Sequence, residues 1–236
     1  EDILEQQNKL PTSVEEKCKV EIRDNNTPNF EDLFIEMTEE QYSQTIQKGR
    51  IKQLCGEFLY EGTLTFLFAN TGVGKSILAH QIGAFVASQQ KLKTAYVDME
   101  ISSHQYLERY APLDDEGNYK DIPKMYENFT RFEFNPNVSV NGKKELMKKI
   151  ETFIKEYDFV IIDNLTNILD NSQDFESGKS FMDEVRRLKE LHKTTLLVVA
   201  HVTKGIKELN SDSMAGTKSL SNSADDMIGL ARVKNK

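Results

Sequence analysis

The sequence predicts an α/β fold in which a mostly parallel, twisted sheet is covered by helices on both faces. From Gly62 onward, apolar segments typical of strands alternate with amphipathic segments typical of helices, as in parallel sheets with helical crossovers. Residues 158–163 are the clearest strand, and both this run and residues 195–200 are short apolar runs that directly follow a helical pattern.

The expected elements can be placed in order along the chain. Residues 38–41, Thr-Glu-Glu-Gln, match a capping box and predict a helix that runs to about Lys48. Strands are then expected at residues 62–68, 94–98, 129–134, 158–163, 195–200 and 227–232. Helices are expected at residues 76–87, around 103–110 and from Asn141 onward. A further helix carries Phe181, Met182, Val185, Leu188 and Leu191 at one-face spacing.

Two regions are predicted: a polar N-terminal arm with a short helix at residues 1–49, and one main domain at residues 50–236. The arm is rich in charge, and Pro11 and Pro28 interrupt any helical period. A chain of 236 residues is long enough to bury one α/β core with a small appendage. Because it opens on Glu1 rather than Met, we expect a piece of a longer protein.

Residues 69–76, Ala-Asn-Thr-Gly-Val-Gly-Lys-Ser, predict a phosphate-binding loop between the first strand of the domain and its helix. They match the Walker A pattern G-x-x-x-x-G-K-[ST] at every fixed position except the first, where Ala69 replaces glycine. In such loops backbone N–H groups surround the phosphates, the lysine adds a positive charge, and the serine hydroxyl can bind Mg²⁺. The expected ATP-binding residues are Asn70, Thr71, Gly72, Val73, Gly74, Lys75, Ser76 and Ile77. An ordinary glycine-containing turn is the alternative, and the flanking strand and helix argue against it.

The composition narrows the classes of partner. The net charge of −8 and the pI near 5.2 give no overall basic surface, so nucleic acid would have to meet a local patch, a loop or an assembly of subunits. Cys18 and Cys55 fit neither a metal site nor a disulfide framework, which agrees with a cytoplasmic protein. The sequence contains no apolar run long enough to span a membrane.

Carboxylates follow two predicted strands at the edge where α/β sheets bind ligands. Asp163 ends a fully apolar strand and is predicted, together with Ser76, to hold Mg²⁺ as a Walker B residue; capping of the next loop is the alternative. Glu100 is predicted to activate the attacking water, because its long side chain can reach from the strand end. Asp98 is the second choice for that role, and otherwise forms a hydrogen bond within the loop.

His201 ends a third strand at the same edge of the predicted sheet. A polar side chain in that place can contact the terminal phosphate of a nucleotide, so we expect His201 to act in catalysis with Lys75 and Glu100. An exposed histidine at a strand end, with no role in chemistry, is the alternative.

These motifs come in the order seen in RecA-like ATPases. The chain resembles the branch of that family that contains plasmid RepA-type helicases, DnaB-type replicative helicases and KaiC. The resemblance covers about residues 50–236 and includes the lead-in at residues 52–62. It also includes the small-residue segment 214–220, which leads to Ala-Asp-Asp at residues 224–226.

The resemblance implies a Mg²⁺-dependent ATPase whose active site is completed by a neighbouring subunit, usually in a hexameric ring around single-stranded nucleic acid. It gives Lys75, Ser76, Asp163, Glu100 and His201 the roles named above. The loop after His201, with Lys204 and Lys207, falls where family members bind single-stranded DNA, although an ordinary connector is an equal alternative. Family members continue past this chain's end with a strand that supplies a basic residue to the neighbour. Here the last lysines or Lys218 supply it, or the strand is absent.

Three functions compete. The first is an ATP-driven motor or assembly factor that acts on DNA in replication, recombination or the mobilisation of an element. The second is a KaiC-like regulatory ATPase that switches a protein–protein interface without moving along DNA. A small-molecule kinase is the third, and it is disfavoured because the segment 170–174 is acidic and polar rather than an arginine-rich lid.

Overall fold

The computed structural model describes residues 37–47, 49–111, 113–120, 127–133, 135, 143–164, 175–202 and 222–232. The chain divides into two compact units, residues 1–50 and 51–236. In the first unit, α2 (Glu39–Gln47) begins with the predicted capping box. The Thr38 N–H donates to Gln41 Oε1 at 2.8 Å, and the Gln41 N–H donates to Thr38 Oγ1 at 3.3 Å. None of the residues of α2 is buried.

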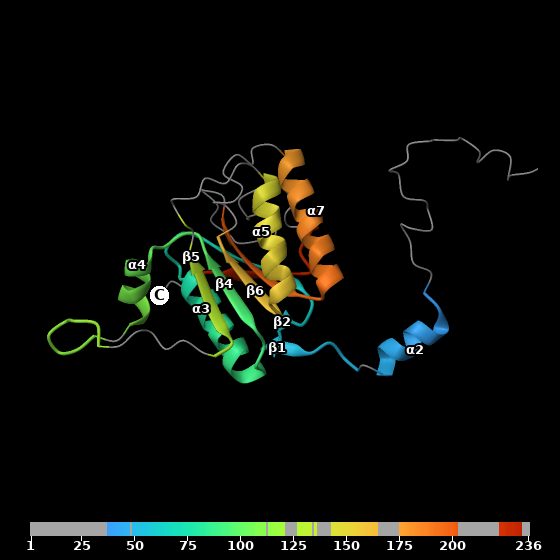
Figure 1. Cartoon of the computed structure of the whole chain (residues 1–236), viewed down its shortest axis with the longest axis horizontal. Coiled ribbons are helices and arrows are strands. Elements are labelled where there is room, and N and C mark those ends of the chain that lie inside the picture. The colour runs from blue at the N-terminus through green and yellow to red at the C-terminus, as the bar shows by residue number, and fades with distance from the viewer. Residues whose placement is uncertain are drawn as a thin grey trace, which may run out of the picture. The chain divides into compact units, whose positions relative to one another are not determined.

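The second unit is built on a parallel sheet, and the predicted fold class is confirmed. Among the described residues, six strands lie in the order β5-β4-β6-β7-β3-β8 (Figure 1), and all neighbouring strands are parallel. Their bounds are β3 Leu64–Ala69, β4 Thr94–Asp98, β5 Phe129–Glu133, β6 Phe159–Asp163, β7 Thr195–His201 and β8 Asp226–Leu230. A separate antiparallel hairpin precedes them, formed by β1 (Gln53–Cys55) and β2 (Leu59–Tyr60).

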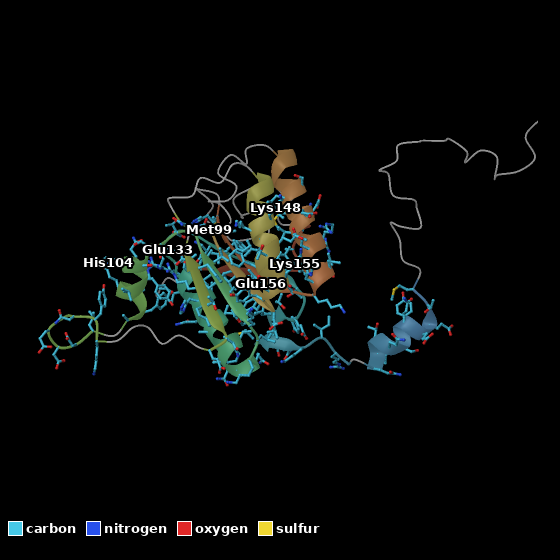
Figure 2. All side chains as sticks on the ribbon, in the orientation of Figure 1. Met99, His104, Glu133, Lys148, Lys155 and Glu156 are labelled. Carbon is cyan, nitrogen blue, oxygen red and sulfur yellow. The ribbon has the colours of Figure 1, made fainter. Side chains whose placement is uncertain are left out.

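Helices cover both faces of this sheet, because its strands are apolar on both sides. On one face lie α5 (Lys143–Glu156) and α7 (Phe175–His192), and on the other lies α3 (Lys75–Phe85), which continues as the π-helical turn η2 (Val86–Gln90) (Figure 1). The α5 helix buries Ile150 and Ile154, whereas Lys148, Lys155 and Glu156 project from its exposed side (Figure 2). No helix in the described part of the chain is long and apolar enough to cross a membrane.

One core position of α7 differs from the prediction. Phe181, Met182, Val185 and Leu188 are buried as expected, but the side chain of Leu191 is 61% exposed. Lys189 is buried instead, and its ammonium group donates to Gly62 O and Asp225 Oδ2, both at 2.7 Å. The last turn of α7 therefore packs on the sheet through an ion pair, and a hydrophobic period cannot indicate that arrangement.

Strand register brings the predicted site residues together at the carboxyl edge of the sheet. Asp98 at the end of β4 lies beside Asp163 at the end of β6, and Ala69 at the end of β3 lies beside His201 at the end of β7. The short helix α4 (Ser103–Tyr110) follows β4 at this edge. In an open α/β sheet this edge is where ligands bind.

Candidate active site

The loop between β3 and α3 has the backbone that the glycine pattern predicts. Gly72 and Gly74 adopt φ values of 75° and 108°, which side-chain-bearing residues rarely adopt. A Cβ atom at either position would meet nothing within 4 Å, so backbone conformation rather than space requires glycine there. Ala69 is buried in β3 and pairs with His201. Because it ends β3 and does not adopt a positive φ, alanine can stand there in place of the glycine of the motif.

Lys75 begins α3, and its side chain turns back over the loop. The residue is only 5% exposed, and Nζ donates to the carbonyls of Ala69 at 3.1 Å and Asn70 at 3.2 Å. Burial lowers the pKa of Lys75, and the negative charges of Glu100 and Asp163 oppose that shift. A buried ammonium group held by carbonyl oxygens at a glycine-containing loop is well placed to meet an incoming phosphate.

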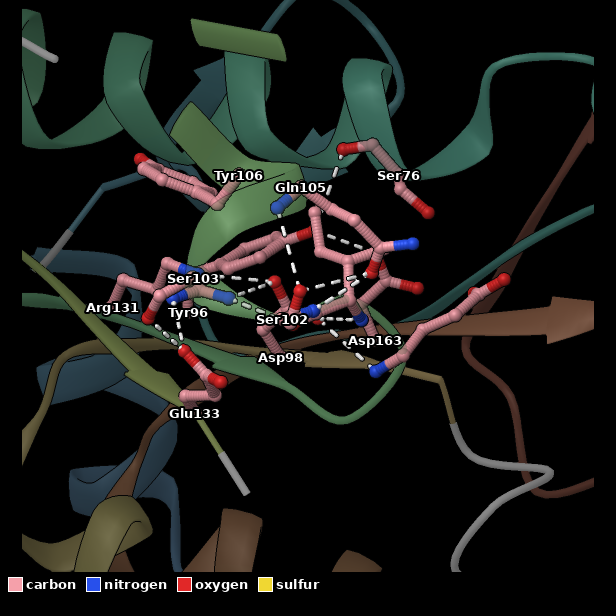
Figure 3. A network of polar contacts seen from close by, with 12 residues as sticks. Ser76, Tyr96, Asp98, Ser102, Ser103, Gln105, Tyr106, Arg131, Glu133 and Asp163 are labelled. Carbon is pink, nitrogen blue, oxygen red and sulfur yellow. Dashed lines mark hydrogen bonds and ion pairs between the residues drawn. The ribbon is translucent and has the colours of Figure 1, made fainter. Parts of the chain in front are cut away.

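Asp163 is a buried carboxylate with one oxygen satisfied and one not. The Tyr96 hydroxyl donates to Oδ2 at 2.5 Å, whereas Oδ1 has no hydrogen-bond partner among the described atoms. Burial raises the pKa of Asp163 to about 6; hydrogen bonds from Tyr96 and Ser76 oppose the rise, and the charges of Glu100 and Asp98 add to it. Figure 3 shows Ser76 and Asp163 close to Tyr96. A hydroxyl beside an unpaired carboxylate oxygen fits Mg²⁺, which prefers oxygen ligands.

Asn164 joins two of the predicted catalytic residues. Its side-chain Nδ2 donates to Glu100 Oε2 at 3.0 Å and lies 2.9 Å from His201 Nε2. Asn164 is buried, whereas Glu100 is exposed. Asn164 was not among the residues predicted from the sequence, although its position directly after the buried carboxylate of Asp163, at the ligand-binding edge, was a usable signal.

The contact with Asn164 favours one tautomer of His201. Because the Glu100 carboxylate only accepts, the amide nitrogen of Asn164 must face it, and His201 Nε2 must then accept as well. In the tautomer that satisfies the shorter of the two ring contacts, the one with Asn164, the proton is on Nδ1, 3.4 Å from Lys75 Nζ. Burial and the charge of Lys75 both lower the pKa of His201, which favours this neutral form. In that tautomer two donors face one another across the loop, and a shared anionic acceptor would satisfy both.

Asp98, the second choice for activating water, is already fully engaged. Its Oδ2 accepts from Arg131 Nε at 3.0 Å and Nη2 at 2.8 Å, and its Oδ1 accepts from the N–H groups of Glu100 and Ile101, both at 3.1 Å (Figure 3). Arg131 was not among the residues predicted from the sequence. A cation within an otherwise strand-like segment was the signal that could have identified it.

Some predicted residues lie outside the part of the chain that the structure describes. They are Lys204, Lys207, Lys218, the segment 214–220 and the C-terminal lysines Lys234 and Lys236. Another basic residue, which the sequence analysis passed over, does contact the loop. Arg232 follows β8, and its Nη2 donates to the carbonyl of Gly72 at 2.6 Å.

The comparison with protein families agrees with this site. A family model described as an AAA domain matches residues 37–206, which is most of the chain. The match includes the loop at Lys75, both strand-end acidic residues Glu100 and Asp163, and His201. No curated protein matches the chain. The chain belongs to the AAA domain family and is an ATPase of the P-loop class.

Proposed function

We propose that the protein is a Mg²⁺-dependent ATPase of the RecA-like RepA, DnaB and KaiC branch, that it acts on DNA, and that neighbouring subunits complete its active site. The observation that supports this proposal best is the connected set at the carboxyl edge of the sheet. Lys75 contacts His201, His201 contacts Asn164, and Asn164 donates to Glu100. Asp163 lies at the same edge with one carboxylate oxygen unpaired among the described atoms.

In this proposal the loop residues 70–77 bind the phosphates of ATP. The backbone of the loop and the N-terminus of α3 favour an anion, and the Lys75 ammonium adds a full positive charge. Ser76 and Asp163 would hold Mg²⁺, which neutralises charge on the β- and γ-phosphate oxygens. The rise in the Asp163 pKa is consistent with this role, because a buried carboxylate is stabilised by a cation.

Glu100 is the proposed acceptor for the attacking water. Its carboxylate accepts a hydrogen bond from Asn164 at 3.0 Å. The oxygens of the other candidate, Asp98, already accept hydrogen bonds from Arg131 and from backbone N–H groups. In the tautomer that the Asn164 contact favours, His201 carries its proton on Nδ1, next to Lys75, so both would donate to the γ-phosphate. Asn164 therefore connects the His201 ring, which would contact the phosphate, to Glu100, which would orient the water.

A basic residue from a neighbouring subunit is proposed to complete the site. Phosphoryl transfer develops charge that an additional cation stabilises. Among the described basic residues near the loop, Arg131 is paired with Asp98 and Arg232 holds the Gly72 carbonyl. This arrangement supports a homo-oligomer, and a hexameric ring is the form that the family resemblance suggests.

Single-stranded DNA is proposed to bind the loop after His201. That loop begins where β7 ends, next to the contact between His201 and Lys75, so nucleotide state could reach it directly. Replacing Lys204 and Lys207 by alanine is expected to weaken single-strand binding and reduce its salt dependence. Lys148 and Lys155, which are exposed on α5, supply a matched double substitution that leaves binding unchanged.

The test of the proposal is steady-state ATP turnover over a range of protein concentrations, with and without Mg²⁺ and single-stranded DNA. We expect turnover to require Mg²⁺, to be stimulated by DNA, and to rise per mole of protein as the concentration increases. Specific activity independent of protein concentration would contradict a site shared between subunits.

The KaiC-like regulatory ATPase is the second candidate, and the net charge of −8 favours it because the chain has no overall basic surface. It predicts turnover that requires Mg²⁺ and depends on protein concentration but is indifferent to DNA. That result would contradict the DNA proposal and direct the search to protein partners.

A further inference from the structure

We propose that Arg131 is a positioning residue that holds Glu100 in place for hydrolysis by acting through Asp98. This inference rests on the proposed function, because it assumes that Glu100 orients the attacking water. In the described structure Arg131 makes no hydrogen bond to the phosphate loop; most of its hydrogen bonds are to the segment that carries Glu100.

The Arg131 side chain forms hydrogen bonds to both ends of the turn after β4. Arg131 lies on β5, where it pairs in register with Tyr96 of β4, and its side chain is only 8% exposed. Its guanidinium group donates twice to Asp98 Oδ2, at 3.0 and 2.8 Å, and once to Ile101 O at 3.0 Å (Figure 3). The planar guanidinium can make these bonds together because its N–H groups form a rigid fork.

Asp98 passes this constraint to the backbone of Glu100. Its second oxygen, Oδ1, accepts from the N–H groups of Glu100 and Ile101, both at 3.1 Å. Residues 98 to 101 are thereby fixed through a side chain, two amide groups and a carbonyl. The Glu100 carboxylate, which is exposed, is left to reach Asn164.

The same guanidinium ties this turn to the helix of the phosphate loop. It lies 4.4 Å from the centre of the Tyr106 ring on α4, and the Tyr106 hydroxyl lies 2.7 Å from His80 Nε2 on α3. The Arg131 guanidinium also donates to Glu133 Oε2 at 3.1 Å. The same oxygen accepts from the Ser103 hydroxyl at the start of α4. Arg131 therefore relates the position of Glu100 to that of the loop that would hold the phosphates.

A purely structural role is the weaker explanation for this buried charge. A buried ion pair contributes little net stability compared with apolar residues of similar size, and β5 lies at an edge of the described sheet, where an apolar side chain could pack against Tyr106. Of the four hydrogen bonds that Arg131 makes among the described residues, three instead go to Asp98 and Ile101, the residues on either side of the Glu100 segment. A displacement of about 1 Å in a catalytic group can reduce turnover by about a hundredfold.

The test combines Arg131→Gln with Glu100→Gln. In single-turnover assays well below the melting temperature, Arg131→Gln is expected to lower the hydrolysis rate by about tenfold to a hundredfold, with the Kd for ATP within about twofold of wild type. Placed on top of Glu100→Gln, it should lower the rate no further. Arg131→Lys keeps the charge but loses the fork, so it should be intermediate.

Lys189→Met is the matched control. It also breaks a buried ion pair, with Asp225, but beside the amino end of β3 and away from Glu100. It is expected to lower the melting temperature and leave the hydrolysis rate unchanged. If Arg131→Gln does not fold, Asp98→Asn is used in its place. Asparagine removes the negative charge from the pair but keeps the shape of the side chain and one of its two oxygens.

The outcomes separate this inference from the proposed function. If Glu100→Gln hydrolyses ATP at the wild-type rate, the role proposed for Glu100 is wrong and the inference falls with it. Two other results would overturn the positioning role alone, provided that Glu100→Gln is slow. In the first, Arg131→Gln lowers the hydrolysis rate equally in the wild-type protein and in Glu100→Gln. In the second, Arg131→Gln weakens ATP binding as much as it slows hydrolysis. If Arg131→Gln lowers the hydrolysis rate only when Glu100 is intact, the positioning role is supported.

Discussion

The side-chain amide of Asn164 donates a hydrogen bond of 3.0 Å to the carboxylate of Glu100. Asn164 is buried and directly follows β6, whereas Glu100 is exposed and follows β4. The bond thus anchors a surface carboxylate to the centre of the sheet. Since the same amide nitrogen lies 2.9 Å from His201 Nε2, Asn164 connects the residues proposed to meet water and phosphate.

Asn164→Ala is expected to lower kcat by about tenfold, because Glu100 loses its anchor, while the Kd for ATP stays close to wild type. Asn164→Asp keeps the shape but places a second carboxylate against Glu100, so it should be at least as slow. Rapid-quench turnover and nucleotide titration measure the two quantities. Wild-type kcat in both variants would contradict the role of Asn164.

Lys75→Ala is expected to abolish measurable nucleotide binding, because it removes the buried ammonium that faces the loop. Titration with a fluorescent ATP analogue tests this directly. Lys155→Ala is a suitable control, since Lys155 is exposed on α5 and pairs only with its helix neighbour Glu151 among the described residues. Tight binding by Lys75→Ala would refute the assignment of the phosphate loop.

Glu100→Gln is expected to bind ATP with unchanged affinity and to hydrolyse it at least a hundredfold more slowly, in keeping with the usual contribution of a general base. Glutamine can still accept from Asn164 through its amide oxygen, so the local structure should persist. Single-turnover hydrolysis compared with equilibrium binding separates the two effects. An unchanged rate would transfer attention to Asp98.

His80 should make the folded state sensitive to acid. Burial and the charge of Arg131 lower the pKa of His80 to about 4; the groups that face its ring are Tyr106, Tyr110 and Tyr96. As the pH falls from about 6.5 toward 4, the unfolded chain takes up this proton before the folded protein does. Stability contributed by neutral His80 is therefore present above about pH 6.5 and lost below it.

The measurement is the melting temperature of wild type and His80→Phe between pH 4 and pH 7. Phenylalanine keeps a ring among these aromatic neighbours but cannot titrate. We expect the melting temperature of wild type to fall more steeply toward low pH than that of the variant. Parallel curves would show that His80 does not contribute to the acid sensitivity.

Gly83→Ala is expected to destabilise the protein, although alanine normally favours a helix over glycine by about 1 kcal/mol. A Cβ at Gly83 would lie 2.7 Å from Ile161 Cδ1 and 2.7 Å from Phe129 Cε2, inside contact distance. Overpacking of this kind typically costs about 1 to 3 kcal/mol. Urea unfolding measures the change in stability. Ile161→Val removes one of the two contacts, so Gly83→Ala should destabilise the protein less in that background. A stabilised Gly83→Ala protein would refute the close packing.

Local sequence chemistry was sufficient for most of the fold. The capping box at Thr38, the strand 94–98 and the helix 103–110 are found where they were predicted, because capping and hydrophobic periodicity act over a few residues. The motif of the phosphate loop likewise fixed the sites of Gly72 and Gly74, whose positive φ angles only glycine adopts freely.

The partners of residues that act across the sheet could not be assigned in this way. Asn164, Arg131 and Arg232 became candidates only when strand order placed them beside Glu100, Asp98 and Gly72, partners far away in the sequence. The burial of Lys189 in place of Leu191 has the same origin, since its partner Asp225 lies on a different element.

The sequence by itself determined the α/β class, the phosphate loop and the strand-end positions of Asp163, Glu100 and His201, because these depend on local periodicity and on a short motif. Only the tertiary structure decided which carboxylate is engaged and which is free to face the site. That choice depends on the registers of β5 on β4 and of β4 on β6, which set Arg131 against Asp98 and leave Glu100 to Asn164.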